Sequence, residues 1–323
     1  MKVSVVMPVY NGRDYLKEAM DSILNQTYRD FEFIIINDCS TDDTQQIIDS
    51  YADARIVCLR NEQNLGVARS LNRGLDAAQG EYIARMDADD IARPDRLALQ
   101  TAYMDAHPEI PVLATASQSF DETGVLFEGH SSVDPDILKL DFLFSCGICH
   151  PTVMLRRAVL EQYQLRYDHS FNKIEDYELW CRMMDLGLPI ACLDVILLDH
   201  RLHQNQVTSV YSPDMLRKLE TLYRRNFAQL GIEPDAAEFD AFFAYCLQDT
   251  LQKKPDYRKL CSLLEKALSS GHFEPRKTKK YCRGLAVRAM RDDALSIGEM
   301  FSYAKASPFL NFTDVLRFGL LKR

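Results

Sequence analysis

The first 90 residues alternate short apolar runs with amphipathic segments, and this alternation limits the fold more than any other feature. The β-branched runs predict strands, and the segments between them have helical spacing. The predicted strands are Val3–Met7, Phe31–Ile36, Arg55–Leu59 and Tyr82–Met86, and the predicted helices are Asp14–Asn25, Asp42–Tyr51 and Val67–Ala78. Strands buried on both faces of a parallel sheet have this composition. The pattern predicts an α/β fold with a doubly wound, mostly parallel, Rossmann-like sheet.

Beyond residue 90 the alternation loosens, and after about residue 210 the pattern is helical. We expect a helix from Pro94 to about Ala106, strands at Val112–Ala116, Val153–Leu155 and Ile190–Leu198, and a helix at Asp176–Leu186. Further helices are expected near residues 214–230, 235–252, 256–269 and 277–291, separated by glycine and proline. We predict a first domain of residues 1–210, with halves 1–100 and 101–210, and a helical C-terminal region of residues 211–323.

Composition indicates an ordinary soluble protein, with 47% hydrophobic and 26% charged residues. The apolar run at the N-terminus ends at Pro8 and is too short for a signal peptide. No stretch approaches the roughly 18–20 apolar residues that a membrane helix needs. Nine cysteines, an odd number, are typical of free thiols in a reducing compartment. We therefore expect a cytoplasmic protein.

One cysteine pair has a spacing that suggests a cofactor. The segment Cys146–His150 matches the C-x-x-C-H pattern of covalent haem attachment. That modification usually follows export, which the N-terminal sequence does not predict. Zinc is not indicated either, because no second Cys/His pair lies at zinc-finger spacing.

Charge is distributed unevenly along the chain. Residues 250–323 hold 16 Lys and Arg against 7 Asp and Glu, whereas residues 1–249 hold 22 against 40. The acidic front suits metal ions and disfavours nucleic acid. Two segments of the basic tail, Arg276–Lys280 and Leu316–Arg323, mix cations with apolar residues. This mixture predicts peripheral docking on the inner face of the cell membrane, although a solvated helical face has the same pattern.

Carboxylates follow two predicted strands at the edge where such sheets bind ligands. Asp38 follows Phe31–Ile36, and the run Asp87–Asp90 follows Tyr82–Met86. Crowded carboxylates repel one another, and Mg²⁺ or Mn²⁺ held together with substrate phosphates relieves that repulsion. The alternative is a solvated acidic turn that caps the helix beginning near Pro94.

Two common phosphate-binding loops are missing from the sequence. Neither G-x-x-x-x-G-K-[ST] nor G-x-G-x-x-G occurs, so a bound diphosphate would depend on a metal ion. Tyr10 and Asn11 follow the first strand, where an aromatic ring and an amide can stack on and pair with a base. Ordinary packing is the alternative for Tyr10.

Four motifs in order resemble the family 2 glycosyltransferases of the GT-A fold. They are Pro8–Gly12 with Ser22–Thr27, then Ile36–Asp42, Asn64–Arg69 and Asp87–Asp90. The resemblance covers about residues 1–205 and is strongest to about residue 100. It implies an inverting enzyme that moves a sugar from a nucleotide diphosphate, commonly uridine diphosphate, to a hydroxyl group. A glycan or lipid-linked glycan in bacterial surface polysaccharide, lipopolysaccharide or capsule assembly is the implied acceptor.

The resemblance also implies roles on the nucleotide side. Pro8, Tyr10 and Asn11 would line the base pocket, and Asp38 would accept a hydrogen bond from the base. Arg69 would lie near the nucleotide, where a guanidinium offsets negative charge. A surface arginine on an amphipathic helix is the alternative for Arg69.

Further roles follow for the diphosphate side. Asp87, with Ala88 beside it, would reach the ribose, and Asp89 would bind the metal that stabilises the departing nucleotide. His203 would complete the metal site or contact a phosphate. A lone histidine after a strand is as often a structural hydrogen-bonding group.

The acceptor side is represented by two segments of the second half. Lys173–Arg182 resembles the family's acidic motif, in which Asp176 would be the general base, with Glu175 as the second candidate. At a helix start the dipole favours an ionised carboxylate, although a residue that only caps the helix has the same position. His150–Met154 also resembles a segment near the acceptor.

Two other functions fit part of the pattern. A sugar nucleotidyltransferase would carry a Gly-rich basic loop after the first strand, and Pro8–Arg13 is not such a loop. A non-catalytic nucleotide-sugar binding protein would not need Asp87, Asp89 and Asp176 together. The sequence therefore favours the transferase.

Overall fold

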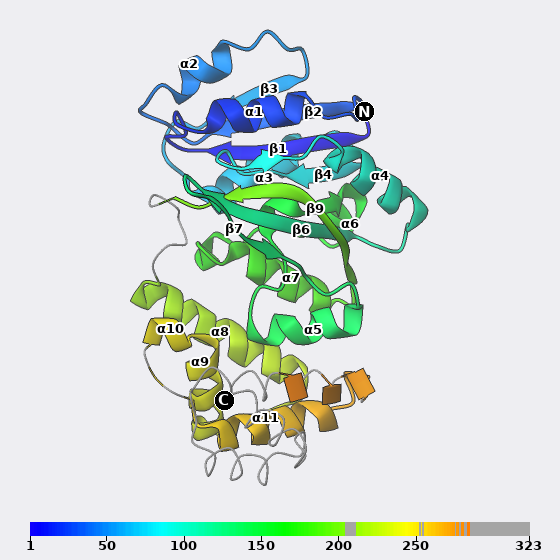
Figure 1. Ribbon diagram of the computed structural model, residues 1–323, viewed down its shortest axis with the longest axis vertical. Helices are drawn as coiled ribbons and strands as arrows, with labels where there is room; N and C mark the ends of the chain where they lie inside the picture. The colour runs from blue at the N-terminus through cyan, green and yellow to red at the C-terminus, as the bar shows by residue number, and fades with distance from the viewer. Residues whose placement is uncertain are drawn as a thin grey trace. The chain divides into compact units, whose positions relative to one another are not determined.

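The computed structural model describes residues 1–203, 211–251, 253, 255–274, 276–277, 279–280 and 283–284. The chain divides into two compact units. The first consists of Met1–Leu138 and Cys146–Met215, and the second of Lys139–Ser145 and Leu216–Arg323. Figure 1 shows the helices and strands of each unit.

In the described part of the first unit, nine strands form one sheet in the order β3-β2-β1-β4-β8-β6-β9-β5, and β7 pairs with β6. They are β1 (Val3–Val9), β2 (Phe31–Asn37), β3 (Ile56–Arg60), β4 (Tyr82–Arg85), β5 (Ile91–Ala92), β6 (Val112–Asp121), β7 (Gly124–Gly129), β8 (Met154–Arg156) and β9 (Ile190–Arg201). Strands β1 to β4 pair in parallel, as do β6 and β9. The pairings of β5, β7 and β8 are antiparallel.

Helices cover both faces of the parallel strands because side chains alternate along each strand. Val5 and Met7 of β1 belong to the apolar core that contains the buried side of α1 (Leu16–Leu24). Val6 points the other way, toward α3 (Val67–Ala77), where a Cβ added to Gly74 would lie 2.3 Å from its Cγ1. The absent side chain at Gly74 thus lets α3 approach the sheet. The doubly wound arrangement predicted from the sequence is present (Figure 1).

Burial differs between the central and the edge strands. Every residue of β2 and of β4 is buried, as expected for strands covered on both faces. The expectation is wrong for β3, whose residues are half-buried or exposed because it is the last strand of the sheet. Two short helices flank this half of the sheet, α2 (Thr44–Asp49) and α4 (Arg96–Ala106).

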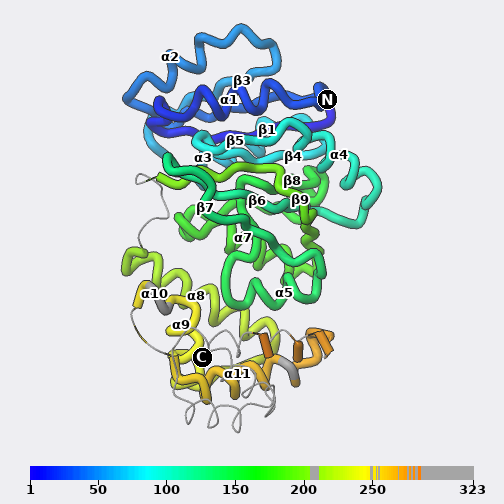
Figure 2. The backbone as a smooth tube through the Cα atoms, in the orientation of Figure 1, coloured from blue at the N-terminus to red at the C-terminus, as the bar shows by residue number. Residues whose placement is uncertain are grey.

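The region after residue 110 is more regular than predicted. Strands β6 and β9 run side by side well past their predicted ends (Figure 2). The sequence pattern missed α5 (Pro135–Phe144), α6 (Arg157–Gln162), β5 and β7. Five of the six β7 residues are exposed, so this strand has no buried face that a period of two would reveal. Helix α7 (Glu175–Asp185) begins one residue before its predicted start.

The second unit is helical where it is described. It contains α9 (Ala236–Cys246), α10 (Gln248–Leu251) and α11 (Tyr257–Ser269), and most of α8 (Pro213–Gln229). One continuous helix was predicted at 235–252, but Leu247 separates α9 from α10. Most of the predicted helix 277–291 and the whole segment Leu316–Arg323 lie outside the described residues. Among the described helices, none combines the length and apolar character needed to cross a membrane.

Candidate active site

The carboxyl ends of β1, β2 and β4 open onto a cavity of about 590 Å³. Because these strands are parallel, the residues that follow each of them meet at one edge of the sheet. The cavity is lined by Pro8, Val9, Tyr10, Asn11, Gly12, Asp14, Tyr15, Asp38, Asn64, Gly66, Val67, Ser70, Asp87, Ala88, Asp89, Asn172 and His203. Eight of the ten residues predicted from the sequence are among them. The other two, Arg69 and Asp176, are not.

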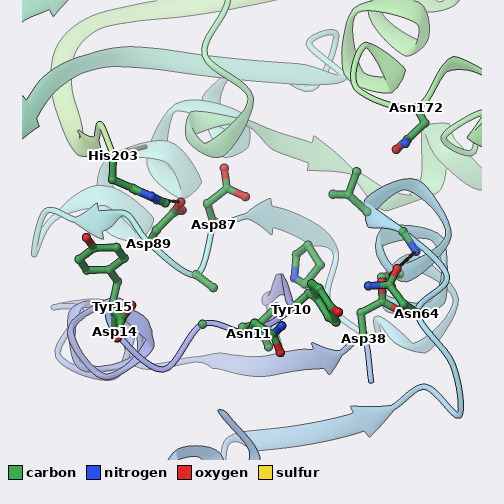
Figure 3. A pocket seen from close by; sticks show the side chains of 17 residues that line it. Tyr10, Asn11, Asp14, Tyr15, Asp38, Asn64, Asp87, Asp89, Asn172 and His203 are labelled. Atoms are coloured by element: carbon green, nitrogen blue, oxygen red, sulfur yellow. Dashed lines mark hydrogen bonds and ion pairs between the residues drawn. The ribbon is translucent and has the colours of Figure 1, made fainter. Parts of the chain in front are cut away.

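The two ends of the cavity differ chemically. Figure 3 shows Asp89 and His203 at one end, Asp38 and Asn64 at the other, and Tyr10 between them. The Tyr10 side chain is 51% exposed, so its ring is available to a ligand rather than packed in the core. One end can therefore hold a cation, and the other offers polar groups beside an open aromatic face.

Asp38 is held by its neighbours before any ligand arrives. Its Oδ1 accepts hydrogen bonds from Asn61 Nδ2 at 2.6 Å and from the Leu65 N–H at 2.8 Å. Its Oδ2 accepts one from the Gly66 N–H at 2.8 Å. Gly66 has φ +82°, a left-handed conformation that favours glycine, and it caps α3. These bonds fix a carboxylate that lines the cavity, and Oδ2, with one bond of its own, retains the capacity to accept another.

Asn11 stabilises the wall of the cavity. Its φ of +50° lies in the left-handed region that asparagine tolerates better than most residues. The side-chain oxygen accepts the Thr41 N–H at 2.9 Å, and the backbone N–H donates to Ser40 Oγ at 2.9 Å. Asn11, which was predicted to line the base pocket, therefore also links the turn after β1 to the segment after β2.

Arg69 lies in an adjoining cavity of about 390 Å³. The two cavities share Gly66 and Asn172. The side chain of Arg69 is exposed, with His169 and Ser170 across this second cavity. The structure thus places Arg69 beside the main cavity rather than in its wall.

Three carboxylates follow β4 as a cluster. Asp87, Asp89 and Asp90 each offer an oxygen, and these atoms lie within 4.8 Å of one another. Burial raises the pKa of Asp90 well above its ordinary value, and the charges of Asp87 and Asp89 raise it further. Oδ2 of Asp90 is buried and has no hydrogen-bond partner among the described residues. This set of oxygens fits a hard divalent cation such as Mg²⁺ or Mn²⁺.

Strand β9 brings a histidine to this cluster. Pairing of β5 with β9 sets Ile91 opposite Asp199, so the chain after β9 passes the acidic turn. The Arg201 N–H donates to Asp90 Oδ1 at 2.9 Å, and Nε2 of His203 lies 2.9 Å from Asp89 Oδ2. The predicted metal pair of Asp89 and His203 is therefore in direct contact.

Arg85 was missed by the sequence analysis. It is the last residue of β4, only 6% exposed, and forms an ion pair with Asp87. Its Nε has no hydrogen-bond partner among the described residues. The buried guanidinium of Arg85 thus places a positive charge next to the acidic turn. In the sequence Arg85 stands inside a predicted strand, so nothing marked it as part of a site.

Asp176 lies outside the cavity, in the first turn of α7. Its Oδ1 accepts the Tyr177 N–H at 2.7 Å, and its Oδ2 lies 3.9 Å from both Cys146 Sγ and His150 Nδ1. Burial raises the pKa of Asp176, although the backbone hydrogen bond and the Arg85 charge oppose that rise. Burial thus acts against the helix dipole, which favours the ionised carboxylate.

Glu175 is more deeply buried than its neighbour. Its residue surface is 6% exposed, and its Oε2 has no hydrogen-bond partner among the described residues. Burial, followed by the charge of Asp176, raises the pKa of Glu175 to about 7. Two adjacent carboxyl groups thus have different environments at the start of one helix.

Other residues of the cavity were not singled out from the sequence. Asn64, Gly66 and Val67 lie in or beside a quoted motif, which gave a signal for them. Asn172 likewise lies beside the quoted segment Lys173–Arg182, whereas Tyr15 had no such signal, because its position depends on tertiary contacts. Tyr15, for example, packs its ring 5.0 Å from that of His203.

With this geometry described, comparison with known proteins assigns the family. The model of glycosyl transferase family 2 matches residues 4–164. An uncharacterized glycosyltransferase of Haemophilus influenzae is 34% identical over 72% of this chain and 76% of its own length. The chain belongs to glycosyl transferase family 2. A second relative is Escherichia coli WfaP, a UDP-Glc:alpha-D-GlcNAc-diphosphoundecaprenol beta-1,3-glucosyltransferase. It is 30% identical to this chain over 68% of this chain and 85% of WfaP.

A solved structure confirms the fold of this glycosyltransferase. The crystal structure of S. aureus TarS 1–349 in complex with UDP-GlcNAc superposes with a TM-score of 0.61 at 20% sequence identity. The match covers 90% of this chain and 87% of that one. The predicted GT-A fold, with helices at the C-terminus, is therefore confirmed.

Proposed function

We propose that the enzyme transfers a sugar, with inversion, from a uridine diphosphate sugar to a hydroxyl group of a lipid-linked glycan in bacterial surface polysaccharide assembly. The observation that carries this proposal is a cavity with acidic side chains at one end and an exposed tyrosine beside polar groups toward the other. The acidic end suits the metal-bound diphosphate of a nucleotide, and the tyrosine suits its base. WfaP, which uses UDP-glucose and a diphosphoundecaprenol-linked acceptor, and TarS, crystallised with UDP-GlcNAc, support the donor and acceptor classes.

On the donor side, residues 1–100 supply most of the binding groups. Tyr10 stacks on the base, with Pro8 and Asn11 shaping its pocket, and Oδ2 of Asp38 accepts an imide N–H. Arg69, in the adjoining cavity, places a positive charge near the nucleotide.

At the other end, Asp87 and Ala88 contact the ribose, and Asp89 with His203 holds Mn²⁺ or Mg²⁺. When bound, such an ion stabilises the negative charge of the departing nucleotide diphosphate. Burial raises the pKa of Asp87, and the charge of Arg85, its ion-pair partner, opposes that rise. The protein thus orients the donor by contacts at both ends.

Residues 101–210 supply the acceptor side. Asp176 takes the proton of the acceptor hydroxyl as the oxygen attacks the anomeric carbon from the face opposite the nucleotide. The new carbon–oxygen bond forms while the bond to the nucleotide diphosphate breaks, and the configuration inverts. A pKa raised by burial makes Asp176 a stronger base once it is ionised.

A thermal-shift screen of nucleotide sugars with Mn²⁺ tests the donor. The specific donor should raise the melting temperature by mass action, by an amount that grows with its concentration. Asp176→Asn should keep this shift and lose transfer, whereas Asp43→Asn, at an exposed aspartate away from the cavity, should keep both. Substantial transfer by Asp176→Asn would refute its role as the base.

We also propose peripheral contact between the second unit and the anionic inner leaflet, where lipid-linked acceptors reside. Four exposed or half-buried cations, Arg276, Lys277, Lys279 and Lys280, support this proposal. Replacing Lys279 and Lys280 by glutamate should reduce co-sedimentation with anionic vesicles and leave recovery with neutral vesicles unchanged. Equal recovery of both proteins with anionic vesicles would contradict it.

A further inference from the structure

A buried histidine and tyrosine lie behind Asp176 and are not explained by donor binding. His150 is 8% exposed and begins a short 3-10 turn, His150–Thr152. Its Nε2 lies 2.8 Å from the Tyr167 hydroxyl, and its Nδ1 lies 3.9 Å from Asp176 Oδ2. The Trp180 ring packs edge-on against the imidazole, with 5.9 Å between the ring centroids, and so limits rotation of the imidazole ring. The three polar groups therefore form a line that ends at the proposed base.

The protonation of this line follows from burial. Burial and the nearby Arg85 charge lower the pKa of His150 well below its ordinary value, so the ring is neutral. Burial raises the pKa of Tyr167, so its hydroxyl keeps its proton. A neutral imidazole has one donor and one acceptor. If the tyrosine donates to Nε2, the ring proton is on Nδ1 and faces Asp176.

Asp176 has one oxygen left for chemistry. Its Oδ1 is occupied by the Tyr177 N–H, whereas the polar contacts of Oδ2 within the described part of the chain are the Cys146 thiol and His150 Nδ1, each at 3.9 Å. This separation exceeds a hydrogen bond by roughly 1 Å, and such contacts often shorten when substrate binds. We expect rotation of the carboxylate to shorten this separation when the acceptor binds.

Tyr167 is itself fixed to the donor side of the enzyme. The Asn72 side chain exchanges two hydrogen bonds with its backbone, Nδ2 to the carbonyl at 2.8 Å and Oδ1 from the N–H at 2.9 Å. Asn72 belongs to α3, whose first residues Val67 and Ser70 line the cavity. A second link nearby is the ion pair of Arg166 with Asp76 at 2.8 Å. The position of Tyr167 thus follows that of α3.

We infer that Tyr167 and His150 are positioning residues for Asp176: the tyrosine fixes the histidine tautomer, and the histidine N–H orients Oδ2 toward the acceptor hydroxyl. The inference rests on the proposed role of Asp176 as general base. Neither residue exchanges a proton with the substrate. Asn72 sets the distance between this line and the donor cavity.

The first test is Tyr167→Phe, which removes one oxygen atom. The turnover number should fall about tenfold, and the donor KM and donor-induced thermal shift should stay within about twofold. Tyr163→Phe, at a 40% exposed tyrosine four residues earlier, is the matched control and should leave both kinetic constants unchanged. Unchanged turnover in a folded Tyr167→Phe would overturn the inference.

The pH profile adds a measurement that a purely structural role would not move. Among the described residues, the titratable groups that contact Asp176 or act on its charge include Arg85, Asp87, Cys146, His150, Tyr167 and Glu175. In Tyr167→Phe only the hydroxyl is lost, the ring can move its proton to Nε2, and a lone pair then faces the carboxylate. The acid limb of the turnover profile should move to higher pH. No movement, or movement to lower pH, would contradict the tautomer assignment.

Two substitutions of His150 separate its two nitrogens. An asparagine amide can place an N–H near the position of Nδ1, whereas the longer glutamine reaches toward Tyr167 and offers none to Asp176. His150→Asn should therefore keep several times more turnover than His150→Gln, with equal donor binding. Equal loss in both folded variants would overturn the inference. If Asp176→Asn retains transfer, the base assignment on which this inference rests fails, whatever the His150 variants do, whereas absence of any donor-induced thermal shift would refute the proposed function.

Discussion

The donor and acceptor sides of the first unit are built on different principles. The donor-side carboxylates follow strands of a parallel sheet, and Asp38 is fixed by two backbone N–H groups and one amide. Asp176 instead follows a turn in which Lys173 has φ +77°, and its Oδ2 has no hydrogen bond or ion pair shorter than 3.9 Å among the described residues. Donor recognition is therefore preorganised by the sheet, whereas the base depends on packing around one helix start.

The electrostatic costs differ in the same way. Near the cavity, burial raises the pKa of Asp90, the charges of Asp87 and Asp89 raise it further, and a bound cation offsets the negative charge of all three carboxylates. At the start of α7, the chief cost for Glu175 and Asp176 is burial, which a cation at Asp89 does not remove. Metal removal and pH should thus act on different sides of the site.

The largest effect is expected from the loss of the metal ligand. Asp89→Ala should lower kcat/KM by at least about 10³-fold, because the leaving nucleotide loses the charge stabilisation of the ion. Exhaustive chelation of the native enzyme should give a similar loss that Mn²⁺ restores. Asp43→Ala, which changes an exposed aspartate, should behave as the native enzyme. Full turnover after chelation would show that the donor side does not depend on a metal ion.

A second prediction concerns the stability of the acceptor side. The pKa of Glu175 rises from 4.5 to about 7 on folding, so the folded state binds a proton more tightly than the unfolded state. The free energy of unfolding should therefore fall as pH rises from about 4.5 to 7. Glu175→Gln lacks this loss and should gain up to about 3 kcal/mol relative to the native enzyme between pH 4.5 and pH 8. Urea unfolding at the two pH values measures it, and parallel stability curves would contradict the burial argument.

A smaller effect is expected at the base-binding end. In Asp38→Asn one carboxylate oxygen becomes an amide that cannot accept, although three donors converge there. The donor dissociation constant should rise about tenfold, or about 1.4 kcal/mol, and the turnover number should change less. Calorimetry with the nucleotide alone gives the binding term. A loss confined to turnover would show that Asp38 serves the chemistry rather than recognition.

The contrast also explains which parts were predictable. Strand-end residues such as Tyr10, Asp38 and Asp89 can be located from sequence, because the end of a parallel strand fixes where the next residue lies. Arg85 and Tyr167 cannot, because an arginine inside a strand and a tyrosine in a loop have no local signal. The position of Tyr167, for example, depends on hydrogen bonds with Asn72, 95 residues away, and on a contact with His150, 17 residues away.

Boundaries failed for related reasons. The two-sided exposure of β7 removes the alternation that would reveal it, and β9 is longer than predicted because β6 and β5 both pair with it. The rise in the pKa of Asp176 could not be predicted, because a helix start is visible in the sequence but burial is not. The sequence therefore predicts features that depend on the local order of residues, but not strand ends or pKa values that depend on tertiary packing.

The smallest effect is expected at two residues with a left-handed backbone conformation, Asn11 on the donor side and Lys173 on the acceptor side. Asn11 has φ +50° and its side chain accepts the Thr41 N–H, whereas Lys173 has φ +77° and its side chain makes no hydrogen bond with the described residues. Asn11→Gly should lose that hydrogen bond and destabilise the fold by about 1 kcal/mol. Lys173→Gly should relieve backbone strain and change stability by between zero and about 1 kcal/mol in the favourable direction. Thermal unfolding of both variants measures the difference, and destabilisation by Lys173→Gly as large as that by Asn11→Gly would mean that the acceptor side is as firmly preorganised as the donor side.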